Sequence, residues 1–172
     1  SWLYYTATVY DQDGMKKALE IQEEKLHKNE SSDYIRPAYN KLRICGDVTI
    51  SENTDLSIFP EVQADGNWYW DEETEQDGFT PTTLTIKEGA ALTLSGLLDI
   101  STATLVNHGT IKCVHGLPFD DHGDAMNEYI PCDAHIRISE EGGYAGNGVV
   151  ECALSVVFQE GLEKDSENLA HQ

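Results

Sequence analysis

Very short runs in which apolar and polar residues alternate recur along this chain at close spacing. Two sets of three such runs each span about seventeen residues: Leu42–Ile44, Val48–Ile50 and Leu56–Ile58, then Leu84–Ile86, Leu92–Leu94 and Leu98–Ile100. Alternation with a period of two places every second side chain on the same side of a strand. Because strands of three residues cannot enclose a core alone, repeated sets of them are typical of stacked architectures. The pattern therefore predicts a mostly β fold, a short parallel β-solenoid.

The alternation continues beyond these two sets and defines a predicted core. Further runs lie at Leu105–Cys113, Ile136–Ile138, Val149–Cys152 and Ser155–Phe158. We expect one inward-facing set of side chains, stacked across the repeats: Leu84, Ile86, Leu92, Leu94, Leu98 and Ile100, near Ile44, Val48, Ile50 and Ile58. A β-sandwich, which usually has longer strands between its turns, remains the alternative.

The first part of the chain has a different pattern. Trp2–Tyr10 alternates aromatic and β-branched residues and predicts a strand. Asp11 or Asp13 then offers a helix N-cap. Apolar spacing of three and four residues predicts an amphipathic helix that ends near Asn29, with this face: Met15, Ala18, Leu19, Gln22 and Leu26. We expect residues 1–38 to form a strand and a helix that caps the open end of a solenoid over residues 39–160, followed by a polar tail over residues 161–172.

Two long acidic loops are predicted as insertions in the solenoid, near residues 60–81 and 117–134. The first contains Trp68, Tyr69 and Trp70, which are candidate ligand-binding residues because aromatic rings can stack on sugars. The alternative is that these rings fasten the loop to the solenoid. If the segment is extended, Trp68 and Trp70 lie on one side and Tyr69 on the other. We expect one side to pack on the solenoid and the other to be partly exposed.

The second loop contains a candidate metal site, formed by Asp120, Asp121, His122 and Asp124. Ca²⁺ is the cofactor that such carboxylates would hold, although the spacing of an EF-hand loop is missing. A solvated acidic loop is the alternative. No nucleophile elbow or phosphate-binding glycine loop is present, and carboxylate pairs are not informative among thirty-one acidic residues. We therefore assign no catalytic residues.

The four cysteines, Cys45, Cys113, Cys132 and Cys152, form no C-x-x-C pair, which argues against a zinc site. Three of them end predicted strands, so that two could stack in adjacent repeats. We predict that one pair of cysteines lies within disulfide range. We prefer Cys113 with Cys132, because this bond would fasten the second loop. Four buried free thiols are the alternative.

The charge balance limits the possible partners. The chain contains eleven Lys and Arg residues and thirty-one Asp and Glu residues, so that its formal net charge is −20. This charge repels nucleic acid and anionic membrane surfaces.

The chain has no apolar run of a length that spans a bilayer, so that no membrane insertion is expected. We interpret the sequence, which begins at Ser1, as a mature piece of a longer protein.

Two stretches carry a resemblance to a known family. TLTIKEGAALTLSG at residues 83–96, followed by LVNHGTI at residues 105–111, resembles the coils of right-handed β-helices in bacterial surface proteins. VYDQDGMKKAL at residues 9–19 and ICGDVTI at residues 44–50 resemble the capped start of pectate-lyase-like and adhesin-like β-helices. The resemblance implies a right-handed solenoid and an extracellular or cell-surface location.

From these features we expect a noncatalytic, secreted or cell-surface module with a structural or adhesive role. Its partners would be glycans or surface proteins. The alternatives are a carbohydrate-binding module that uses Trp68, Tyr69 and Trp70, and a fragment of a polysaccharide-degrading enzyme.

Overall fold

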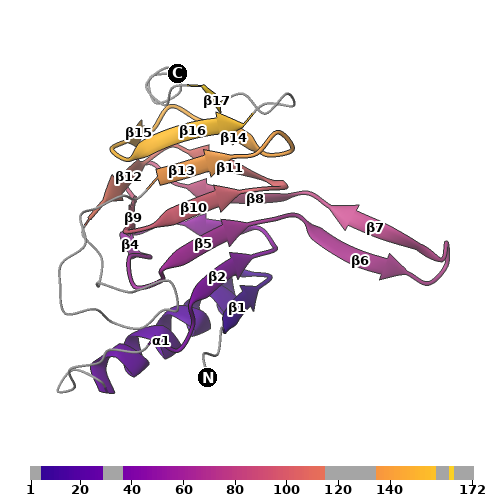
Figure 1. The fold of residues 1–172 in the computed structure, drawn as a ribbon, viewed down its shortest axis with the longest axis horizontal. Coiled ribbons are helices and arrows are strands. Elements are labelled where there is room, and N and C mark those ends of the chain that lie inside the picture. Colours follow the sequence, from indigo (N-terminus) through magenta and orange to yellow (C-terminus); the bar gives the residue numbers. More distant parts are fainter. Residues whose placement is uncertain (1–4, 29–36, 115–134, 158–162, 165–172) are drawn as a thin grey trace.

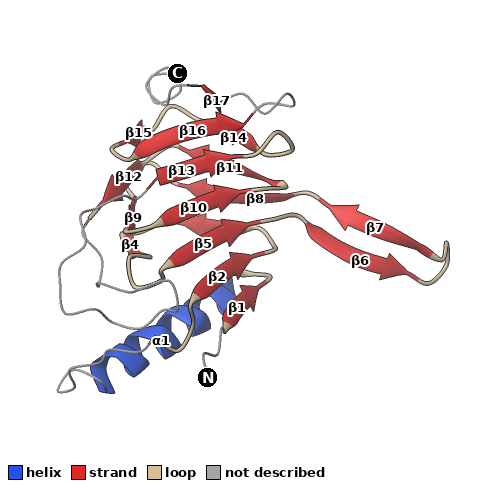
Figure 2. Cartoon of the chain, viewed as in Figure 1, coloured by secondary structure: helices blue, strands red, loops and turns tan. Residues whose placement is uncertain are grey.

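The structure is a computed structural model that describes residues 5–28, 37–114, 135–157 and 163–164. Over these residues the fold is mostly β, and one helix, α1 (Gln12–Lys28), lies at the end of the molecule where the first strands are found (Figures 1 and 2). Three sheets make up the body, and a two-stranded hairpin projects from it.

Each sheet contains strands from distant parts of the chain. Sheet A has the order β1 (Thr6–Val9), β2 (Lys41–Ile44), β5 (Glu61–Ala64), β10 (Leu97–Ile100), β13 (His135–Ile138), β16 (Ala153–Val157) and β17 (Glu163–Lys164). Sheet B has the order β14 (Gly143–Ala145), β11 (Ala103–Asn107), β8 (Thr82–Ile86) and β3 (Val48–Ile50). Sheet C has the order β15 (Val149–Val150), β12 (Thr110–Cys113), β9 (Ala91–Leu94) and β4 (Thr54–Asp55). The hairpin is β6 (Asn67–Asp71) with β7 (Gln76–Thr80).

The chain visits the three sheets in turn. Strands β2, β3 and β4 lie in sheets A, B and C, and the same order returns in β10, β11, β12 and in β13, β14, β15. Every described pair in these sheets is parallel, except β16 with β17. The sandwich alternative, which requires antiparallel sheets, is therefore wrong.

The core is formed by the inward side chains, as the alternation predicts. The predicted core residues Leu84, Ile86, Leu92, Leu94, Leu98 and Ile100 are all buried, together with Ile44, Val48 and Ile50. Ile58 is only half-buried against this cluster, because the chain turns there and Leu56 and Phe59 enter the core instead. The third strand of the first set is β4, just before the predicted Leu56–Ile58.

The repeating unit predicted from the sequence is shifted by one strand relative to the repeating unit in the structure. The predicted equivalence places Leu42 beside Leu84, but Leu42 pairs with Val62 and Leu84 pairs with Val48. The cause is β5, which lies inside the predicted insertion at residues 60–81 and belongs to sheet A. Its inward residues are Val62 and Ala64, and the small side chain of Ala64 adds little apolar signal.

Strand β1 and helix α1 lie within the segments where the sequence predicts a strand and a helix, and residues 2–4 of the predicted strand lie outside the described residues. Asp11 caps α1, because its Oδ1 accepts a hydrogen bond from the Gly14 N–H at 2.8 Å. The side-chain amide of Gln12 both donates to the Thr49 carbonyl at 3.0 Å and accepts from the Thr49 N–H at 2.9 Å. Thr49 lies in β3, the edge strand of sheet B, so that Gln12 pairs with this edge as a neighbouring strand would.

Candidate functional site: the aromatic hairpin

The hairpin begins where β5 leaves sheet A, and polar contacts fix its base. The Gly66 N–H donates to the Thr102 Oγ1 at 2.8 Å, and the Thr82 hydroxyl donates to the Asp65 carbonyl. The buried Asp65 carboxylate accepts a hydrogen bond from the Arg43 Nε at 2.7 Å. These contacts join the base of the hairpin to sheets A and B, while β6 and β7 extend away from the body (Figure 1).

Aromatic rings on the hairpin lie directly over glycine backbone. A Cβ atom at Gly78 would be 2.4 Å from the Tyr69 ring, and Tyr69 and Gly78 are cross-strand partners. A Cβ atom at Gly66 would be 2.1 Å from the Phe79 ring. Both contacts require a residue without a side chain, so that glycine at these positions sets where the two rings lie.

The two faces of the hairpin differ in composition. Trp68 and Phe79 are cross-strand partners, and their ring centroids are 4.6 Å apart. Trp70 follows on the same face, where its cross-strand partner is Asp77. Tyr69 lies on the opposite face, as the alternation predicts.

The prediction that one face packs on the body is wrong. Trp68, Tyr69 and Trp70 are 61%, 47% and 59% exposed, and Phe79 is 37% exposed. Because the hairpin extends away from the sheets, neither face reaches the core; the Trp68 ring contacts Phe79, and the Tyr69 ring lies over Gly78. The predicted loop is therefore a hairpin whose aromatic side chains are open to solvent on both faces. Four of the eight large apolar side chains exposed in the described part of the chain belong to it.

The distal half of the hairpin is strongly acidic. Residues 67–80 contain no Lys or Arg and five acidic residues: Asp71, Glu72, Glu73, Glu75 and Asp77. Asp71 holds the turn, because its Oδ1 accepts hydrogen bonds from the Glu73 and Thr74 N–H groups at 2.9 and 3.4 Å. Glu75 completes the turn in a left-handed conformation with φ of 52°. Aromatic rings and carboxylates thus share one projecting element.

A second polar group, which no sequence motif marks, lies on the outer face of sheet A. Asp99 and Arg137 are neighbours across the β10–β13 pair. Burial raises the pKa of the Asp99 carboxyl, Arg137 opposes this shift, and Asp65 and Glu61 add to it. The Asp99 Oδ1 is buried without a hydrogen-bond partner. The alternation of Leu98, Asp99 and Ile100 places Asp99 outward, but only the neighbouring strands reveal its surroundings.

The predicted metal site at Asp120, Asp121, His122 and Asp124 lies outside the described residues. Within the described ranges, no group of three or more His, Cys, Asp or Glu side chains is placed to hold a metal ion.

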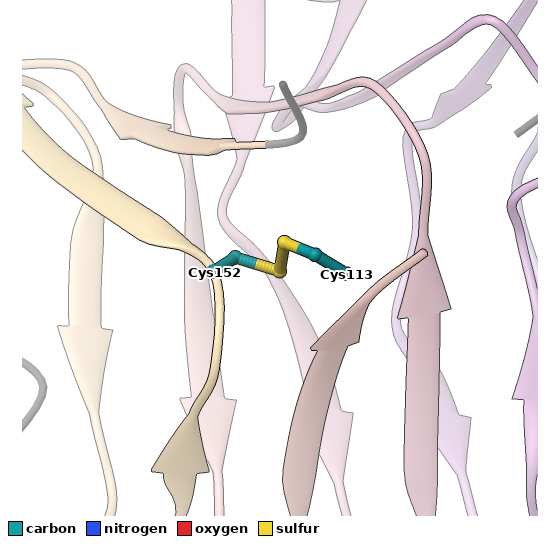
Figure 3. The surroundings of a disulfide bond; sticks show 2 residues. All are labelled: Cys113 and Cys152. Carbon is teal, nitrogen blue, oxygen red and sulfur yellow. A yellow bond between two sulfur atoms is a disulfide. The ribbon is translucent and has the colours of Figure 1, made fainter. Parts of the chain in front are cut away.

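The disulfide is Cys113–Cys152, and the preferred pairing of Cys113 with Cys132 is wrong. Figure 3 shows the bond between the two side chains. The two Cα atoms are 5.3 Å apart. Cys113 ends β12 and Cys152 follows β15, its neighbour in sheet C, so that stacking of adjacent repeats brings them together. The prediction that one pair lies within disulfide range is confirmed. Cys45 is a buried free thiol, and burial raises its pKa.

Comparisons of the chain with protein-family models, curated proteins and solved structures found no match. Among the described residues, no helix has the length and apolar character needed to cross a membrane.

Proposed function

We propose that this chain is a noncatalytic module of a secreted or cell-surface protein, in which a β-solenoid holds out the hairpin as an adhesive element. The observation that carries this proposal is the solvent exposure of Trp68, Tyr69 and Trp70 on a projecting hairpin. Exposing such rings is unfavourable, and clustered exposed apolar side chains are typical of interaction sites.

The finer fold in this proposal is a right-handed parallel solenoid. The regular return of the chain to sheets A, B and C supports it. Parallel strands in one sheet that are joined by a crossover are almost always connected in the right-handed sense. Helix α1 would cap the first coil, as Gln12 does for the edge of β3.

The Cys113–Cys152 disulfide supports the extracellular location. Disulfides persist in oxidising compartments and are rare in the cytosol of most organisms.

Carbohydrate binding is the second candidate function. Trp68 and Trp70 share one face of the hairpin, which is the arrangement needed for rings to stack on successive sugars. Glycans and surface proteins are therefore the two partner classes that we propose. The net charge of −20 disfavours nucleic acid as a partner.

Excision of the hairpin tests the adhesive role. Residues 67–80 are replaced by a short Gly-Ser link between Gly66 and Pro81, and the binding of both proteins to arrays of glycans and extracellular proteins is measured. We expect the intact chain to bind at least one ligand and the excised variant to lose that binding while unfolding at a similar temperature. Equal binding by the two proteins, or no binding by the intact chain, would contradict the adhesive role.

A further inference from the structure

The hairpin combines rings and negative charge in a way that favours one of the two partner classes. Building on the proposed adhesive role, we infer that the hairpin binds a cationic protein segment and places an arginine side chain of that segment on the Trp70 ring, beside the Asp77 carboxylate.

The pairing of Trp70 with Asp77 supplies both contacts that a guanidinium group uses. The two residues are directly opposite each other in the β6–β7 ladder, so that their side chains project from the same face. Trp70 is 59% exposed, which leaves its ring accessible. A planar guanidinium can stack on an indole ring, and its N–H groups can donate to a carboxylate at the edge of the stack.

The neighbouring rings of Trp68 and Phe79 are suited to bind apolar side chains of the same protein segment. The ring planes of Trp68 and Phe79 are tilted by 48°, and the rings are in contact. Together they extend the apolar surface of this face toward the base of the hairpin, where Phe79 lies over Gly66. The face therefore changes from apolar at its base to acidic at its tip, which matches a segment that carries both apolar and basic side chains.

Charge is the observation that separates the partner classes. The hairpin has five carboxylates and no Lys or Arg, and it belongs to a chain with a net charge of −20. A neutral glycan would gain no long-range attraction from this charge, and an anionic glycan would be repelled. A basic protein segment would be attracted over the distance of electrostatic steering, and the attraction would weaken as salt is added.

A pair of matched peptides provides the test. The probe is a short Gly-Ser peptide with arginines at alternate positions, so that they project on one side of an extended segment. Its twin carries citrulline, which has nearly the same shape but no charge. Neutral cellohexaose and fully N-acetylated chitohexaose are the competing probes. Binding to the whole chain is measured by calorimetry at low and at physiological salt.

Two variants and two controls locate the binding. Trp70→Ala and Asp77→Asn should each weaken binding of the arginine peptide by about two- to fivefold, as expected for one exposed cation–π contact or one exposed ion pair. Glu88→Gln removes the same charge as Asp77→Asn from an exposed turn outside the hairpin. Tyr10→Ala removes an exposed ring elsewhere. Both controls should bind as the original chain does.

The result expected is binding of the arginine peptide that is stronger than that of the citrulline twin, falls with salt, and depends on Trp70 and Asp77. Equal binding of the two peptides, or equal weakening by Glu88→Gln and Asp77→Asn, would overturn the inference. Failure of the arginine peptide together with Trp70-dependent binding of an oligosaccharide would also overturn it, while the adhesive role of the hairpin would stand. If no probe binds, the inference is overturned and the excision experiment decides the adhesive role separately.

Discussion

Asp99 shows how the surroundings of a single residue set its energetic effect. Its side chain lies on the outer face of sheet A, and its Oδ1 is nevertheless buried without a hydrogen-bond partner. Burial is the largest cause of the raised pKa of this carboxyl, ahead of the opposing effect of Arg137. The ionised form is therefore less favourable in the folded chain than in the unfolded chain.

Replacement of Asp99 by Asn is expected to stabilise the chain at neutral pH. Because the folded state holds this proton more tightly, the contribution of Asp99 to stability falls as the pH rises above the ordinary pKa of 3.8 and through the raised folded value. Asp99→Asn should raise the melting temperature by at most a few degrees at pH 7, and the difference should disappear in acid. A melting difference that grows in acid would contradict this explanation. Glu88→Gln, at an exposed position, serves as the control.

Leu94 tests the buried side of the strands. It is 1% exposed, and its neighbour across β9 and β12 is Cys113. Leu94→Asp would bury a carboxylate without a partner, which costs more than the total stability of a typical domain unless the chain rearranges. We expect loss of cooperative thermal unfolding. Thr85→Asp, on the partly exposed side of β8, should retain it. A normal melting curve for Leu94→Asp would contradict the inward register.

Among the elements, α1 is bound to the segments that flank strands β2 and β4 through buried polar contacts as well as apolar ones. Gln22 is fully buried and donates from Nε2 to the carbonyls of Tyr39 at 3.0 Å and Ile58 at 2.8 Å. Its Oε1 accepts from the Tyr39 N–H at 2.9 Å. The helical spacing places Gln22 on the apolar face, and the three hydrogen bonds explain why an amide is tolerated there.

Gln22→Leu is expected to destabilise the chain although it increases apolar burial. The change leaves the Tyr39 N–H and two carbonyls without their partner, and we expect a loss of about 2–4 kcal/mol in the free energy of unfolding, measured with urea. Glu23→Leu introduces the same side chain at the exposed neighbouring position and should change stability little. Equal effects of the two variants would show that the hydrogen bonds contribute nothing.

The disulfide links two neighbouring elements of sheet C. Cys113 and Cys152 are 39 residues apart in sequence. Closing a loop of that length lowers the conformational entropy of the unfolded chain, which stabilises the folded state by roughly 3–4 kcal/mol. We expect Cys113→Ser to lower the free energy of unfolding by about that amount. Peptide mapping of the unreduced protein should recover Cys113 linked to Cys152. Recovery of Cys113 linked to Cys132 would contradict the pairing.

At the scale of the whole molecule, charge opposes compactness. The chain has a formal net charge of −20 at pH 7, and folding brings these charges together. Added salt screens repulsion between exposed charges.

Moderate concentrations of NaCl should therefore raise the melting temperature by a few degrees. Choline chloride at equal ionic strength should have the same effect, because screening does not depend on the identity of the cation. A rise with NaCl alone would indicate specific cation binding, and no rise with either salt would show that repulsion has little effect on stability.

Much of the core could be predicted from local pattern. Alternation identified Leu84, Ile86, Leu92, Leu94, Leu98 and Ile100 as inward residues, and all are buried. Local pattern does not predict strand β5, because the side chain of Ala64 is small. It does not predict β14 (Gly143–Ala145) either, because the sequence GYA has no alternating pair of apolar residues. The sequence predicts a loop at the hairpin, since neither Asn67–Asp71 nor Gln76–Thr80 alternates apolar and polar side chains.

The sequence by itself determined which side chains of each strand face inward, because the pleat of a β-strand fixes alternation locally. It also determined α1, whose apolar face depends on residues three and four positions apart, while the structure selected Asp11 rather than Asp13 as its cap. Only the tertiary structure decided that Leu42 pairs with Val62, that Cys113 meets Cys152, and that the rings of the hairpin remain exposed. These outcomes depend on which strands from distant parts of the chain stack on one another, and a pattern within a few neighbouring residues does not specify those partners.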